Sequence, residues 1–137
     1  MASDFTKPLF PNHYGPLFLR VSLGAYFLMA GLSKLDWIPK FTDQVIKFNI
    51  LPTQIAQLYA MLLPYTEIMV GTLLIIGMLT RLTCYIGGAL LFSFIYAFGV
   101  FPAGEVMFFN KDIILLAVIL SILSTGAGAF SVDSARK

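Results

Sequence analysis

Four long apolar runs, separated by shorter polar stretches, follow one another along most of the chain. They cover about residues 16–34, 57–79, 82–101 and 112–130. The hydrocarbon core of a bilayer is about 30 Å thick and takes roughly 17–25 helical residues to cross. Because backbone groups cannot stay unpaired in lipid, segments this long and this apolar should be helices. The pattern predicts an all-α fold, an integral membrane bundle of four transmembrane helices.

The connection between the first two runs, residues 36–56, has a different pattern. Its apolar residues recur at near-helical spacing with charged residues between them: Phe41, Val45, Ile46 and Phe48 against Lys40, Asp43 and Lys47. This pattern favours a short amphipathic helix that lies on the membrane surface. A plain solvent-exposed loop is the alternative.

Composition supports the membrane class and excludes several kinds of site. The chain is 58% hydrophobic and 12% charged, whereas an ordinary soluble domain is about a quarter charged. Cys84 is the only cysteine, so one chain cannot build a disulfide, a CxxC pair or a structural zinc site. His13 is also alone, and we expect no metal. The sequence has no nucleotide loop and no basic surface suited to nucleic acid.

Charge at the ends of the runs gives a weak indication of topology. Four spans put both termini on one side of the membrane, where five Lys and Arg residues lie against four on the other. The positive-inside rule then predicts cytoplasmic termini. We expect the membrane to be a bacterial inner membrane. The first run is too long for the apolar region of a signal peptide, so we expect it to be retained.

Glu67 is the most informative charge, because it lies within the second apolar run. A charged residue at the centre of a membrane helix costs about 2.5–3.5 kcal/mol, so it usually faces a partner or a watery cavity. Ala60, Pro64, Glu67 and Gly71 share one mostly small helix face that would admit another helix closely. Glu67 is therefore a candidate for either an interhelical hydrogen bond or a proton carrier.

The remaining candidate site residues are charges nearer the ends of the runs. Arg20 is the natural partner for Glu67, although it lies only four residues inside its run and its side chain could instead extend outward to headgroups. Lys34, Arg81, Lys111 and Asp112 fall at helix ends. They could form a polar cluster over the bundle, or simply anchor the helices at their depth.

Three stretches resemble the DoxX/DoxD family of small four-helix membrane proteins: "RVSLGAYFLMAGLSKL" from Arg20, "EIMVGTLLIIGMLTRL" from Glu67 and "KDIILLAVILSILSTGAGAFSVD" from Lys111. The order and spacing of their glycines and charges carry the resemblance, which covers nearly the whole chain. It implies a single DoxX-like membrane domain over residues 1–137.

The resemblance also implies a place in membrane oxidoreductase systems. One such system is a thiosulfate:quinone oxidoreductase, in which a DoxD-like chain works with a second subunit. By position, the pattern of the DoxX/DoxD family includes six charged residues of this chain: Arg20, Lys34, Glu67, Arg81, Lys111 and Asp112. Quinone is then the candidate cofactor, and other membrane subunits are the expected partners beside the bilayer.

Three functions remain open at this point. The leading hypothesis is a membrane subunit of a larger, quinone-linked redox or respiratory-type complex, acting as an anchor or accessory chain. In the second, Glu67 and Arg20 handle the protons of quinone reduction directly, which would make the chain a catalytic oxidoreductase subunit. The third is a small transporter or channel, because an internal acid also marks such a path.

Overall fold

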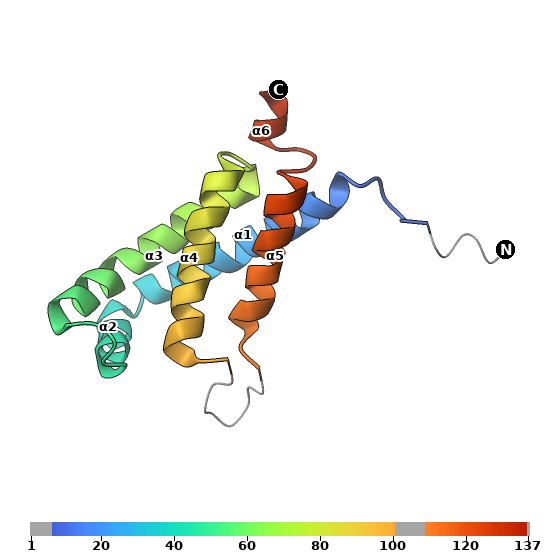
Figure 1. Cartoon of the computed structure of the whole chain (residues 1–137). Coiled ribbons are helices and arrows are strands. Elements are labelled where there is room, and N and C mark those ends of the chain that lie inside the picture. Colours follow the sequence, from blue (N-terminus) through green and yellow to red (C-terminus); the bar gives the residue numbers. More distant parts are fainter. Residues whose placement is uncertain (1–6, 101–108, 137) are drawn as a thin grey trace.

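The computed structural model describes residues 7–100 and 109–136, and all the regular structure in these residues is helical. The helices are α1 (Tyr14–Leu35), α2 (Ile38–Lys47), α3 (Thr53–Ile76), α4 (Thr80–Phe98), α5 (Lys111–Thr125) and α6 (Val132–Ala135). Long helix α1 packs mainly on α3, and α4 packs on α5 and α3. Figure 1 shows short α2 beside the start of α3, at the end of the bundle away from α6.

The crossing of α1 on α3 depends on glycines. A Cβ on Gly71 would lie 2.7 Å from the carbonyl oxygen of Gly24, and a Cβ on Gly31 would lie 2.7 Å from that of Pro64. Small residues let helix backbones approach this closely in membranes. Ala60, Pro64, Glu67 and Gly71 are all buried, so the predicted small face of this helix is confirmed.

An apolar cluster of buried residues forms the core of the described bundle. Its buried members are Leu23, Phe27, Val70, Leu74, Cys84, Leu91, Ile119 and Ile122. Cys84 is 1% exposed among them and packs as a small apolar residue.

The four-span prediction is confirmed only in part. Among the described helices, α1, α3 and α4 are long and apolar enough to cross a membrane. The fourth run, predicted over 112–130, forms a helix of 15 residues, which is about 22 Å long. The helix stops because Gly126 and Gly128 take positive φ angles of 88° and 73°, which no α-helix contains.

Other boundaries agree with the hydropathy pattern to within a few residues. Asn110 caps the start of α5, with its side chain accepting a hydrogen bond from the amide of Asp112. Helix α4 ends at Phe98, and residue 101, the predicted end of that span, lies outside the described residues. Helix α2 forms where the amphipathic pattern predicted it, so the loop alternative is wrong, while its place at a membrane surface stays a prediction.

Candidate functional site

Glu67 pairs with Lys34, across the contact between α1 and α3. The Lys34 Nζ donates to both carboxylate oxygens of Glu67, each at 2.9 Å. It also approaches the carbonyl oxygen of Ala30 at 3.4 Å, one turn back along α1. The lysine of the last turn therefore folds inward rather than out to the surface. The Glu67 side chain is 1% exposed and that of Lys34 is 23% exposed.

The expected pairing of Arg20 with Glu67 is wrong, and so is the outward alternative, because Arg20 is fully buried at the other end of α1. Its Nη1 donates to the carbonyl oxygens of Leu74 at 2.9 Å and Ile75 at 3.0 Å. Its Nη2 donates to those of Ala129 at 3.3 Å and Phe130 at 3.1 Å. One guanidinium thus joins the end of α3 to the chain that follows α5.

Those contacts have a structural purpose. The last carbonyls of a helix and the carbonyls of non-helical backbone lack partners of their own, and lipid supplies none. The planar, permanently charged guanidinium suits several carbonyls at once. Gly77 ends α3 at φ 68°, and a Cβ there would collide with the guanidinium of Arg20.

Asp133 completes this end of the bundle from α6. Its carboxylate accepts hydrogen bonds from the amides of Leu79 at 3.0 Å and Thr80 at 2.7 Å, where α4 begins. Its own amide donates to the carbonyl oxygen of Gly77 at 3.0 Å. Burial raises the pKa of Asp133, but the amide hydrogen bonds outweigh it, so the pKa lies below its ordinary value.

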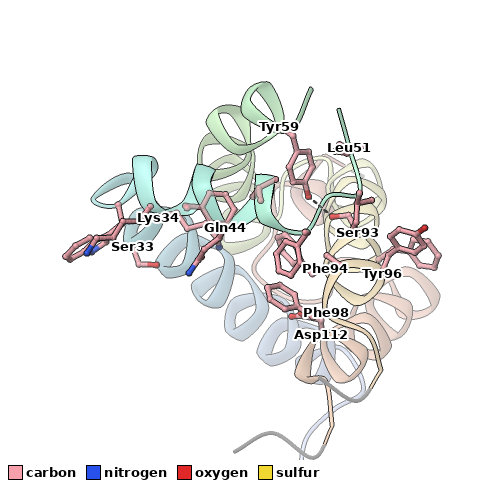
Figure 2. A pocket seen from close by; sticks show the side chains of 18 of the residues that line it. Ser33, Lys34, Gln44, Leu51, Tyr59, Ser93, Phe94, Tyr96, Phe98 and Asp112 are labelled. Atoms are coloured by element: carbon pink, nitrogen blue, oxygen red, sulfur yellow. Dashed lines mark hydrogen bonds between the residues drawn. The ribbon is translucent and has the colours of Figure 1, made fainter. Parts of the chain in front are cut away.

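A pocket of about 870 Å³ opens at the opposite end of the bundle, beside Lys34. Figure 2 shows Tyr59 of α3 and Ser93 of α4 meeting at this pocket, which Phe94, Phe98 and Asp112 also line. The Tyr59 and Ser93 hydroxyl oxygens are 2.7 Å apart. The aromatic residues that line the pocket are Tyr26, Trp37, Phe41, Phe48, Tyr59, Phe92, Phe94, Tyr96 and Phe98.

Lysine side chains lie against these aromatic rings. The Lys34 Nζ is 5.7 Å from the ring centre of Phe41 and 5.6 Å from that of Phe94. Such distances are within the range of cation–π attraction. The ammonium group therefore lies between an aromatic ring from α2, another from α4, and the carboxylate of Glu67.

The other predicted cluster residues divide between the two ends of the bundle. Lys111 and Asp112 line the pocket with Lys34, and Lys111 Nζ lies 3.5 Å from the Asp112 carboxylate. Arg81 is exposed in the first turn of α4, at the Asp133 end, so the structure does not bring it to the other three. Tyr59 and Ser93 were not predicted, since a hydroxyl in an apolar run gives little sequence signal.

Residues 12–106 match the family described as Methylamine utilisation protein MauE. The chain belongs to the MauE family. This corrects the resemblance to DoxX/DoxD proteins, which rested on glycine and charge spacing that several small membrane helices can share. No curated protein and no solved structure matches the chain. With three apolar helices among the described residues, this MauE-family chain is an integral membrane protein.

Proposed function

We propose that this chain is a membrane accessory protein of a redox system for the utilisation of methylamine or a related small amine. Membership of the MauE family supports the amine part of the proposal. The accessory part means that the chain assists a redox enzyme carried by other subunits. Those partner subunits are the ones expected from the sequence.

One observation carries the accessory role: the chain has one cysteine, and it lies in the packed core. Cys84 is 1% exposed, so it is closed to disulfide exchange with a partner, which requires an accessible thiolate. In this proposal, electrons pass through a partner chain or a bound molecule and not through Cys84. The charged and aromatic groups gathered around the pocket give such a molecule a place to bind.

The quinone link expected from the sequence remains part of this proposal. Quinones are membrane-soluble, and the pocket lies at the end of three helices apolar enough to span a bilayer. We also propose that the chain lies in the bacterial inner membrane with both termini in the cytoplasm. A reporter fused to either terminus tests the orientation.

The experiment is deletion of the gene in its own organism, followed by growth with methylamine or ammonium as the nitrogen source. We expect growth to fail on methylamine only and to return when the chain is supplied again. The tagged chain, gently solubilised and studied by native mass spectrometry, should carry cofactor-bearing partner subunits. Normal growth on methylamine, together with a chain that purifies alone, would contradict the proposal.

A further inference from the structure

We propose that the pocket binds the flat, oxygen-bearing ring of a membrane-soluble amphiphile, with Lys34 donating a hydrogen bond to a ring oxygen. Glu67 acts as a positioning residue for Lys34. The inference rests on the proposed function only in the choice of a quinone as the first probe.

The size of the pocket suits a ring with part of a tail. Its volume of about 870 Å³ lies within the roughly 300–1,000 Å³ usual for small-molecule sites. Aromatic side chains reach it from α1, α2, α3 and α4. Such walls favour a flat ring, because aromatic groups gain from stacked or edge-to-face contacts.

Lys34 provides the polar contact. Two of its donors meet Glu67 at 2.9 Å, but its third contact, to the Ala30 carbonyl, is long at 3.4 Å. A backbone carbonyl in a helix already accepts a hydrogen bond from the next turn. The third N–H of Lys34 can therefore donate to a ligand oxygen in the pocket, because giving up the long contact with the Ala30 carbonyl costs little free energy.

Charge balance favours a neutral ring over an anionic head. Two of the three lysines that line the pocket already face carboxylates, Lys34 facing Glu67 and Lys111 facing Asp112. The third, Lys40, lies 4.2 Å from the ring centre of Trp37. An anionic head would have to compete with these carboxylates, whereas a carbonyl oxygen needs only one hydrogen bond.

Glu67 itself does not line the pocket, so it acts on the ligand through Lys34. The carboxylate draws the lysine inward and holds its ammonium between Phe41 and Phe94. Without it, the flexible side chain would be free to extend toward the surface. Phe92 and Phe98 line the pocket and are exposed, so the apolar tail of the ligand can extend past these rings into the lipid.

The test uses the fluorescence of Trp37, the only tryptophan and a lining residue of the pocket. The purified full chain in lipid nanodiscs is titrated with short-tailed ubiquinone and menaquinone analogues. We expect saturable quenching that weakens about tenfold in K34M, as for loss of one hydrogen bond to a charged donor. K34R should retain most of the affinity, and A97F, which fills the pocket at Ala97, should abolish it.

A double-variant cycle tests the positioning role. E67Q should weaken binding when Lys34 is present and add nothing once Lys34 is replaced, because it acts only through that side chain. The K34M/E67Q pair also leaves no unpaired buried charge, so it serves if K34M alone does not fold. K47M, which removes a lysine of α2 outside the pocket lining, is the matched control and should bind normally.

Three outcomes would overturn the inference. Equal quenching in every variant would mean that the analogues merely dissolve in the lipid. Displacement of the quinone analogue by an equal concentration of oleate or phosphatidylglycerol would mean that the site takes an anionic head. Additive effects of K34M and E67Q would remove the positioning role. The assay needs no partner subunit, so a failed growth test leaves it unaffected.

Discussion

Each end of the bundle holds a positive charge of α1, and the two charges have different partners. Arg20 is fully buried, and its four hydrogen bonds go to backbone carbonyls of two segments. Lys34 keeps 23% of its side chain exposed, pairs with a carboxylate and faces a pocket. The Arg20 guanidinium provides hydrogen-bond donors for backbone carbonyls, whereas the Lys34 ammonium has a donor that a ligand can use.

This difference teaches how to interpret charge in a small membrane bundle. A charge enclosed by carbonyls stabilises irregular backbone that lipid could not accommodate. A charge that pairs with a carboxylate beside an open pocket can still donate a hydrogen bond to a ligand that binds in the pocket. The position of a charged residue along its membrane helix does not by itself tell a structural charge from one that can bind a ligand.

The largest effect should come from Arg20. Removing the side chain leaves the carbonyls of Leu74, Ile75, Ala129 and Phe130 without this donor. At roughly 1–3 kcal/mol for each unsatisfied buried group, R20M should lose on the order of 5 kcal/mol of stability. Thermal unfolding in detergent measures this, with R81M as the exposed control. Equal stability of R20M and R81M would remove the structural role.

The ion pair should give the next largest effect. Breaking a buried pair from one side typically costs about 3–5 kcal/mol, whereas replacing both partners is often close to neutral. K34M should therefore be less stable than the wild type, and K34M/E67Q should recover most of the loss. Unfolding curves of the four proteins of this cycle decide the matter. A double variant whose loss of stability equals the sum of the two single losses would show that the pair is not coupled.

The stability of the contact between α1 and α3 should be sensitive to a single added methyl group. In G71A the new Cβ would meet the Leu28 backbone nitrogen at 2.5 Å, which forces α1 and α3 apart. We expect a loss of about 2 kcal/mol, typical of overpacking. G88A is the matched control, because its nearest neighbours lie at 3.8 Å or more. Unfolding of the two variants side by side tests this; similar curves would contradict it.

Asp133 should give the smallest effect and the one that depends on pH. Losing its cap on α4 should cost about 1 kcal/mol in D133A, as for other helix caps. Because its folded pKa lies below the ordinary value, its contribution is present above about pH 4. It is lost as pH falls through the folded pKa.

The measurement is unfolding as a function of pH in the wild type and D133A, with D43A on α2 as the control. The stability gap between the wild type and D133A should close in acid, while D43A follows the wild type. A gap that stays constant down to pH 2 would contradict the cap.

Hydropathy alone predicted most of the helices, because length and apolar composition determine which segments can span. It overestimated the last run, since Gly126 and Gly128 lie in an apolar stretch and hydropathy does not register their positive φ angles. The amphipathic spacing around Phe41 was enough to predict α2 as a helix.

The site was harder to predict because its contacts depend on packing. The carbonyls that bind Arg20 carry no side-chain signal, so the sequence could offer only Glu67 or the headgroups as its partner. Lys34 and Glu67 are 33 residues apart, and only the glycine-dependent approach of α1 to α3 brings them together. Gly31 and Gly71 were visible signals for that register, but only the structure places Gly31 against Pro64 and Gly71 against Gly24.

The most direct test of the account compares R20K with K34M/E67Q, measuring stability and quinone-analogue affinity in the same preparations. We predict that R20K, whose lysine cannot span both carbonyl pairs, loses stability but binds the analogue as the wild type does. The double variant should keep its stability and bind about tenfold more weakly, as expected for one lost hydrogen bond to a charged donor. If R20K loses affinity instead, and the double variant loses only stability, the assignment of the two ends is wrong.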